Sequence, residues 1–514
     1  MKEIFNDYKE IFTRFLKNKK YMYILLFVGI LSYGFTITHY SIGIDDLSLD
    51  RYVQGTYILS AKRWGTWALY NVLHIVRFSP FWLDFIVATL MILMALLICT
   101  AIKRVVKEKF NIWAYIIFGA IFVSNPLIAQ FFIFQSTNLS VAVSNILAII
   151  SAIIVFENYF NLKNKWYFIL AGGILIFAIS SYESCFQTYL VIYFMMLFLK
   201  VLTQDIKIKK LIEAVLYGFF SGLIGIIGYY ITGSITIFIL DKMHILQNDL
   251  ADHSIPWLAN DFINLSFDKK IEYINKNVII KLANGIKSFL PVPVFIISSI
   301  ISIAIGVIQK NKNKSIIVML LLFIVAFNYI LLIAQIEVSY RIQFSWIVTT
   351  AFLCMYIYIM LKDKRIIKYL ISISLVLLIV LQTNNLNNLF YNDYRRYEKE
   401  KFVANQIVMD IKKCDNYNDK KILYIITSKN TYTFVNDFDH KIYYLLWGTL
   451  AFKEYGTETT KFLNNLGYNF KTVTEVEYEK VIKDNYNIIS QNEDKNVLEL
   501  DNYIIVNLTH YLSE

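Results

Sequence analysis

The chain has 514 residues, of which 57% are hydrophobic and 17% are charged. A soluble globular protein of this length carries more charge and fewer apolar residues, so the composition excludes that class and indicates a polytopic membrane protein. The formal net charge of +11 requires no nucleic acid as a partner, because Lys and Arg fall in short clusters between apolar runs, where they mark membrane topology. The four cysteines lie far apart without a C-x-x-C pair, so neither a disulfide framework nor a zinc site is predicted.

About eleven apolar runs approach the roughly 20 residues that a membrane span needs. The predicted spans are centred in residues 22–39, 81–102, 112–127, 138–156, 166–182, 186–203, 212–240, 290–309, 315–335, 342–361 and 369–384. The segment before the first run is polar and no small-residue cleavage site follows that run, which favours a retained first helix over a signal peptide. Basic linkers such as 103-KRVVKEK-109 and 310-KNKNK-314 alternate with less basic ones, which predicts a cytoplasmic N terminus and an extracytoplasmic C terminus.

Two of the external segments are expected to contain short helices as well as linkers. Residues 40–80 mix apolar, aromatic and basic side chains, a pattern typical of helices that lie in the membrane interface. Residues 241–289 are broken at Pro256 and are long enough for further short helices that shape a cleft or lid.

After the last apolar run the composition is no longer that of a membrane segment. Residues 394–413 predict a helix, and residues 421–427 and 503–508 predict strands. We therefore expect a mainly helical transmembrane bundle in residues 1–390 and a small extracytoplasmic α/β domain in residues 391–514.

Polar groups that apolar spans hold at the outer edge of the membrane are the candidates for chemistry. The adjacent acids Asp45 and Asp46 come a few residues after the first span. In an ordinary loop such acids solvate a helix end, while Ser48 or Asp50 caps the next helix. The same segment is also rich in basic side chains, namely Arg51, Lys62, Arg63, His74 and Arg77. A basic site beside a carboxylate is suited to an anionic substrate.

Two further external turns carry charge. Glu183 lies in a hairpin between two spans, close in sequence to Tyr182 and Gln187, and these side chains either orient a polar ligand or form a solvated turn. Glu337 and Arg341 lie in a turn so short that both stay at the membrane face, where Arg341 alternatively anchors in the headgroups. The histidines are scattered, and no metal site is predicted.

The acidic pair 45-DD-46 is followed by 50-DRY-52 and by 63-RWG-65, which leads into an aromatic-rich segment. This arrangement resembles the type II glucosyl transferase family, the polytopic glucosyltransferases of bacterial serotype conversion. The turn 182-YESCFQTY-189, the Arg341 turn and residues 384–407 extend the resemblance over most of the membrane part. The tail beyond Lys412 shows no such resemblance.

The resemblance implies a GT-C type fold with its active site on the outer face and a donor sugar carried by polyprenyl phosphate. The absence of a Gly-rich phosphate loop from the sequence agrees with a donor that is not a nucleotide sugar. An acceptor hydroxyl then needs a carboxylate base, which Asp45 or Asp46 would supply. Cations stabilise the departing lipid phosphate, and the expected ones are Arg341, Lys62, Arg63 and Arg77. The expected substrate-binding residues are Glu183, Tyr182, Gln187, Glu337 and His74.

We therefore expect an enzyme of the bacterial cytoplasmic membrane that transfers a hexose, expected to be glucose, from polyprenyl phosphate onto a cell-envelope glycan. A single displacement predicts inversion at the anomeric carbon, and no cofactor is expected. Two alternatives remain: a transporter or flippase of lipid-linked sugar, and a non-catalytic assembly protein of the envelope. A flippase would not require an acid pair on one face only.

Overall fold

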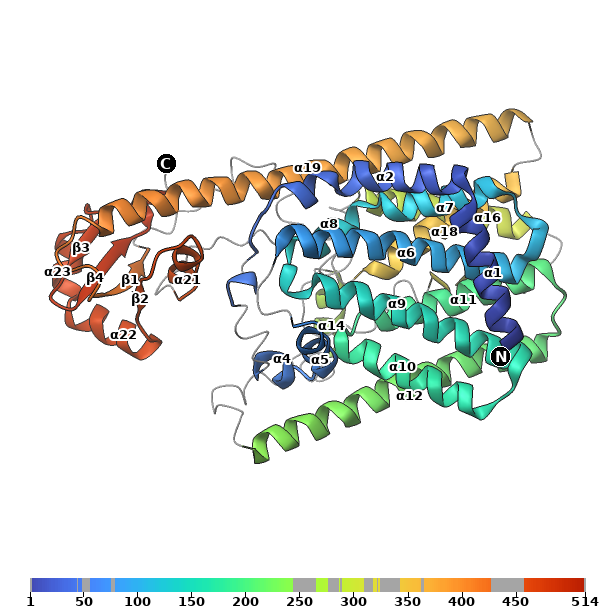
Figure 1. Ribbon diagram of the computed structural model, residues 1–514, viewed down its shortest axis with the longest axis horizontal. Coiled ribbons are helices and arrows are strands. Elements are labelled where there is room, and N and C mark those ends of the chain that lie inside the picture. Colours follow the sequence, from blue (N-terminus) through green and yellow to red (C-terminus); the bar gives the residue numbers. More distant parts are fainter. Residues whose placement is uncertain are drawn as a thin grey trace. The chain divides into compact units, whose positions relative to one another are not determined.

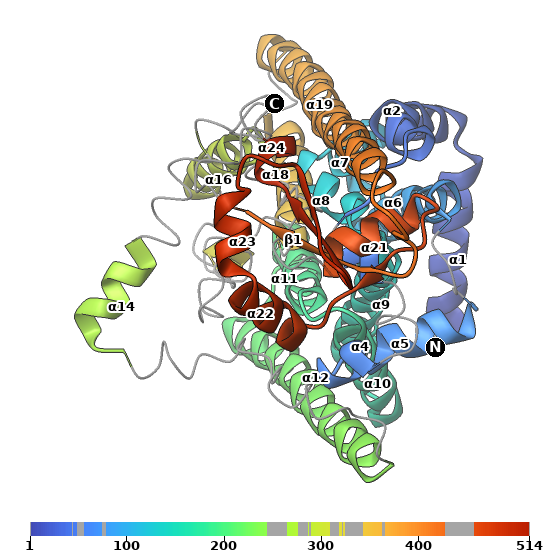
Figure 2. The same ribbon diagram turned by 90° about the vertical axis from the view of Figure 1, so that its left-hand side faces the viewer.

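The computed structural model describes twelve ranges of the chain, and the following account concerns these residues. They are residues 2–43, 45–48, 56–74, 79–243, 265–275, 286, 289–308, 318–320, 322–323, 343–361, 365–426 and 457–512. The chain divides into two compact units, shown from two directions in Figures 1 and 2. Unit 1 comprises Met1–Thr38, Asp50–Phe132 and Thr137–Asn388, and unit 2 comprises His39–Leu49, Ile133–Ser136 and Leu389–Glu514.

Among the described residues, eight helical segments are long and apolar enough to cross a membrane. They are α2 (Lys19–Thr38), α6 (Pro80–Val106), α7 (Ile112–Val123) with α8 (Ala129–Ile133), α9 (Gln135–Glu157), α11 (Cys185–Thr203), α12 (Ile208–Lys242), α18 (Phe344–Leu361) and α19 (Arg365–Ile411). Two shorter apolar helices, α10 (Lys165–Ser181) and α16 (Pro291–Ile308), coincide with two further predicted runs. The eleventh run, 315–335, lies mostly outside the described residues, so the mainly helical membrane fold is confirmed and the count of eleven remains a prediction.

Burial separates central from peripheral helices in unit 1. Helix α7 is apolar on all sides, and 94% of the apolar window of the segment formed by α7 and α8 is buried, as expected of helices in the middle of a bundle. Helices α2, α6 and α7 run side by side, and α18 packs against α7, α11 and α16 (Figure 1). In contrast, only 11% of the window of α12 is buried, and side chains such as Ile227 are exposed. An apolar helix with such a surface needs lipid to cover it.

The segment after the first span contains two short helices, within the residues 40–80 where the sequence predicts interfacial helices. They are α4 (Thr56–Ser60) and α5 (Trp64–Val72), and α5 packs against α10. Within residues 241–289, the described part contains α14 (Phe267–Ile274). An additional helix, α1 (Lys2–Lys17), precedes the first span and packs on α6 and α2.

The tail contains a four-stranded mixed sheet with the strand order β2-β1-β4-β3. Its strands are β1 (Lys421–Ile425), β2 (Lys471–Thr472), β3 (Val497–Glu499) and β4 (Tyr503–Asn507). Strand β1 is parallel to β2 and β4, whereas β3 is antiparallel to β4. The strands that the sequence predicts at 421–427 and 503–508 are thus confirmed as β1 and β4.

Side chains alternate between the two faces of this sheet, as the pleat of a strand requires. Ile422 and Ile504 face the C-terminal part of α19 and the helix α21 (Thr457–Asn465), in a core that also contains Ile42 and Leu47. Leu423 faces the other side, toward α22 (Glu475–Asp484) and α23 (Tyr486–Gln491). Figure 2 shows these helices around the sheet. The last helix among the described residues is α24 (Thr509–Leu512).

Helix α19 is one continuous helix of 47 residues, where the sequence analysis expected a span over 369–384 and a separate helix over 394–413. The connecting residues 385–393, NLNNLFYND, contain neither Gly nor Pro. Nothing in them therefore ends a helix, although Asn has only moderate helix propensity.

Candidate functional site

A bidentate ion pair joins Arg63 to Glu183 in unit 1. The Nε atom of Arg63 donates to both carboxylate oxygens of Glu183, at 3.0 and 3.1 Å, and a terminal nitrogen lies 3.0 Å from Oε2. Both side chains are largely shielded, with 17% and 27% of their surface exposed. Tyr229 donates its hydroxyl to the same carboxylate at 3.3 Å, and the guanidinium carbon lies 5.1 Å from the centre of the Tyr182 ring. The position and plane of the guanidinium are therefore fixed.

Lys62 brings a second cation to this place. Its Nζ atom lies 3.9 Å from the centre of the Tyr230 ring and 3.4 Å from the Ser234 hydroxyl, so α12 holds the ammonium group by a cation–π contact and a hydrogen bond. We call Lys62, Arg63, Tyr182, Glu183, Tyr229 and Tyr230 the Arg63 cluster. Two cations and one carboxylate leave this cluster with a net positive charge.

The motif 63-RWG-65 positions this cluster by close packing of α5. A Cβ atom on Gly65 would lie 2.5 Å from the hydroxyl oxygens of Ser180 and Ser181, so only glycine lets α5 approach the end of α10 this closely. Thr66 donates to the backbone carbonyl of Ser181 at 2.6 Å, and the indole nitrogen of Trp64 donates to Thr232 at 3.2 Å. Each residue of the motif therefore fixes the short helix to α10, to α12 or to Glu183.

The remaining candidates of unit 1 occupy different surroundings. Gln187 is buried in α11 and accepts a hydrogen bond from the Ser345 hydroxyl of α18 at 3.1 Å, so it takes part in helix packing. His74 is exposed after the end of α5 and has a left-handed backbone, with φ of 50°. Arg77, Glu337 and Arg341 lie outside the described residues.

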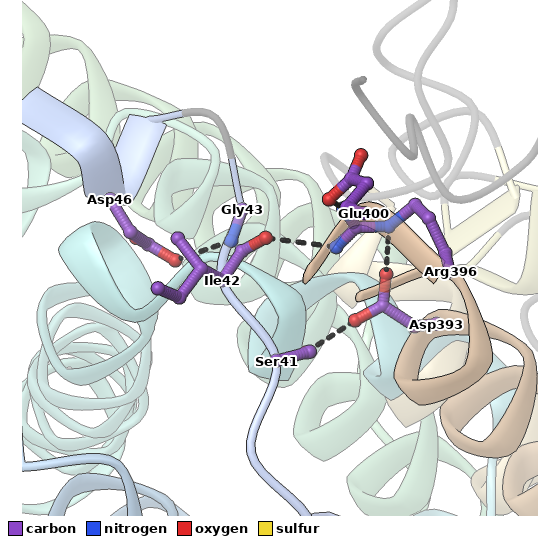
Figure 3. A network of polar contacts seen from close by, with 7 residues as sticks. All are labelled: Ser41, Ile42, Gly43, Asp46, Asp393, Arg396 and Glu400. Atoms are coloured by element: carbon purple, nitrogen blue, oxygen red, sulfur yellow. Dashed lines mark hydrogen bonds and ion pairs between the residues drawn. The ribbon is translucent and has the colours of Figure 1, made fainter. Parts of the chain in front are cut away.

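The acidic pair belongs to unit 2, where Asp46 is 6% exposed. One carboxylate oxygen of Asp46 accepts from the backbone nitrogen of Gly43 at 3.0 Å, as Figure 3 shows. The other accepts from the backbone nitrogen of Ser136, in the first turn of α9, at 2.7 Å. Hydrogen bonds from backbone amides favour the ionised form of a carboxylate. Asp45 begins the 3₁₀ helix η1 (Asp45–Ser48), and its side chain lies outside the described atoms.

A buried charge cluster in unit 2 was missed by the sequence analysis. Arg396 is 1% exposed and forms ion pairs with Asp393 at 3.0 Å and with Glu400 at 2.6 Å, and it donates to the carbonyl oxygen of Ile42 at 2.8 Å. Asp393 also accepts from the hydroxyl of Ser41 (Figure 3). The spacing i, i+3, i+7 on one helix face was visible in the sequence. However, a charged helix face in a polar tail is usually solvated.

Asp84 is a second residue that the sequence analysis missed. It is buried near the start of α6, where the Asn138 amide donates to it at 3.2 Å. The signal was a single carboxylate at the start of an otherwise apolar run. As for metals, the described residues contain no group of three His, Cys, Asp or Glu side chains that could hold an ion.

Comparison with known protein families gives a match. The family model described as Glucosyl transferase GtrII matches residues 34–358, which is more than half of the chain. No curated protein and no solved structure matches the chain. The matched range includes the acidic pair, the RWG motif and Glu183, whereas residues 384–407 lie beyond it. The resemblance found in the sequence is confirmed, and the chain belongs to the GtrII glucosyl transferase family, a membership that implies a glycosyltransferase with many membrane-spanning helices.

Proposed function

We propose that this membrane glycosyltransferase moves glucose from a polyprenyl-phosphate donor onto a cell-envelope glycan at the outer face of the bacterial cytoplasmic membrane. Family membership supports transfer of glucose. The membrane helices support a lipid-linked donor, because the lipid tail of such a donor lies in the same bilayer as the helices. The absence of a nucleotide-binding loop from the sequence also supports it.

The observation that carries this proposal is the Arg63 cluster. Glu183 fixes the guanidinium of Arg63 through two nitrogen atoms, and Lys62 adds a point charge held by α12. A planar guanidinium is suited to two phosphate oxygens, and a preorganised cation stabilises the charge that builds up on a leaving group. In this proposal Arg63 and Lys62 bind the donor phosphate, while Glu183 and Tyr182 orient Arg63. Arg341 and Arg77 are proposed as further phosphate-binding residues.

Asp45 is the proposed general base. Both oxygens of Asp46 already accept from backbone amides, and adjacent side chains in an extended or turn backbone do not aim at one atom. The base removes the proton of the acceptor hydroxyl, the freed oxygen attacks the anomeric carbon, and the bond from that carbon to the phosphate oxygen breaks. Polyprenyl phosphate leaves, and the configuration at the anomeric carbon is inverted.

The test is transfer of labelled glucose from polyprenyl-phosphate glucose to isolated envelope polysaccharide by the purified protein. Asp45→Asn removes basicity but keeps size, and loss of a general base lowers the rate by roughly 10² to 10⁴. Donor binding should survive in this variant. Transfer from UDP-glucose instead of the lipid donor would contradict the proposed donor, and parental transfer by Asp45→Asn would contradict the proposed base. Movement of the lipid donor across vesicles without transfer would favour the flippase.

A further inference from the structure

One peptide group of unit 2 joins a buried guanidinium to the acidic pair. The carbonyl of Ile42 accepts from Arg396 at 2.8 Å, and the N–H of Gly43, which belongs to the same planar peptide, donates to Asp46 at 3.0 Å (Figure 3). Hydrogen bonds at the two ends of one peptide polarise it and strengthen each other. The orientation of this peptide is thus coupled to the guanidinium on one side and to Asp46 on the other.

Arg396 is itself held in a single orientation. Asp393 binds its Nε and Glu400 binds one terminal nitrogen, which leaves the other terminal nitrogen directed at Ile42. A buried ion pair contributes little to stability on average, because desolvation of the charges offsets their attraction. Its rigid geometry can instead specify one conformation, and here the conformation specified is that of residues 41–43.

Residues 39–41, which precede the acidic pair, each contact α19. The ring of His39 lies 5.1 Å from that of Tyr394, and the ring of Tyr40 lies 5.5 Å from that of Tyr397. The hydroxyl of Ser41 follows with its hydrogen bond to Asp393. Successive residues of the segment therefore contact one face of the helix.

The backbone at Gly43 packs closely against its neighbours because glycine has no side chain. A Cβ atom at this position would lie 2.9 Å from the backbone carbonyl oxygen of Ile133 and 3.2 Å from a carboxylate oxygen of Asp46. Because the nearest atom belongs to the backbone, it cannot move aside easily. The close approach that places the Gly43 amide on Asp46 is available only to glycine.

We propose that Arg396 is a positioning residue for glucosyl transfer, which acts through the Ile42–Gly43 peptide to fix the backbone that carries Asp46 and the base Asp45. The proposal rests on the function proposed above. A misplacement of a reacting group by about 1 Å costs about 100-fold in rate. Since donor binding is assigned to the Arg63 cluster, the loss should appear in kcat and not in the donor KM.

The test compares Arg396→Lys with Arg395→Lys. Lysine keeps the charge at position 396 but lacks the planar fork that binds Asp393, Glu400 and Ile42 together. Arg395 is exposed on the same helix, so the matched variant controls for the substitution itself. We expect kcat to fall about 10- to 100-fold in Arg396→Lys at unchanged donor KM, with parental values in Arg395→Lys. A parental kcat in Arg396→Lys, or a loss confined to donor KM, would overturn the proposal.

Gly43→Ala provides a second, independent variant. It disturbs the same peptide while leaving the ion pairs of Arg396 in place, and it decides the question if Arg396→Lys does not accumulate in the membrane. The same fall in kcat at unchanged donor KM is expected, and a parental kcat contradicts the proposal.

Combination with Asp45→Asn separates this proposal from the proposed function. If Arg396 acts through the base, Arg396→Lys should lower the residual rate of Asp45→Asn by no more than about twofold. A full further loss in that background overturns the positioning role. Parental transfer by Asp45→Asn overturns the assignment of the base, and the positioning role with it. A dead Asp45→Asn beside a parental Arg396→Lys overturns the positioning role alone.

Discussion

Arg63 and Glu183 are 120 residues apart in sequence, and each supplies the countercharge that the other needs in a largely shielded position. A largely shielded guanidinium without a countercharge is costly, and Glu183 supplies that charge with two hydrogen-bonded oxygens. The pair also restricts the rotamers of Arg63, so a bound phosphate meets a side chain that is already ordered. In the proposed function, Glu183 therefore affects donor binding through Arg63.

A double-mutant cycle on this pair tests that dependence. Arg63→Lys keeps the charge but loses the fork, and we expect the donor KM to rise about tenfold, which corresponds to about 1.4 kcal/mol. Glu183→Gln should raise the donor KM by a similar factor because the guanidinium is no longer oriented. The double variant should be no worse than the poorer single variant. Losses that multiply in the double variant would show that the two residues act independently.

At the scale of elements, the packing of α5 against α10 depends on one glycine. A methyl group at position 65 meets Ser180, Ser181 and the Ser181 backbone nitrogen, all within 2.8 Å. Overpacking of this kind costs about 1 to 3 kcal/mol, so Gly65→Ala should lower the thermal stability of the purified protein. It should also displace Arg63, the residue before the helix, and so weaken donor binding.

The control for this variant is Gly173→Ala in the neighbouring helix α10. A Cβ atom on Gly173 meets nothing within 4 Å, and alanine is the better helix former by up to about 1 kcal/mol. We expect unchanged or slightly raised stability and parental transfer. Equal effects of the two alanines on thermal unfolding and transfer would show that the contact between α5 and α10 is not what matters.

Hydrophobic runs predicted most helices of unit 1, because long apolar stretches in a membrane protein have one favourable structure. Helix α1 was missed because its charged residues concealed the apolar positions Ile4, Tyr8, Ile11 and Phe15, which recur at helical spacing. The continuity of α19 was missed because the change of composition near residue 390 resembles a boundary. Local sequence thus revealed the apolar elements better than the amphipathic or mixed ones.

The polar sites were less predictable than the helices. Asp46, Arg63 and Glu183 stood out as charges at membrane edges, but the pairing of Arg63 with Glu183 depends on how α5 packs on α10. Likewise, nothing local to Arg396 indicates that it binds the carbonyl of Ile42. Such contacts join residues more than a hundred positions apart, and only the folded chain brings them together.

At the scale of the whole molecule, the described basic linkers at residues 103–109, 163–165 and 207–210 lie at one end of unit 1. The ammonium group of Lys109, after α6, donates to the carbonyl of Thr203 at the end of α11. The hydroxyl of Tyr159, after α9, donates to the carbonyl of Lys210 in the first turn of α12. Helix α10 begins at Lys165, beside these linkers in sequence, and ends at Ser181 next to Glu183. The basic linkers and the Arg63 cluster therefore lie at opposite ends of a helix of about 25 Å.

This arrangement makes the orientation in the membrane testable with two matched cysteines. Lys209, in the first turn of α12, and Lys480, in α22 of the tail, are both exposed helical residues. Of the native cysteines, only Cys414 is not fully buried, so a Cys414→Ser background is suitable.

The positive-inside rule places Lys209 in the cytoplasm. We expect a membrane-impermeant thiol reagent to label Lys480→Cys in intact cells, and to label Lys209→Cys only after the membrane is permeabilised. Labelling of Lys209→Cys in intact cells, with protection of Lys480→Cys, would invert the topology and place the Arg63 cluster on the cytoplasmic side, where nucleotide sugars are available and a lipid-linked donor would not be required.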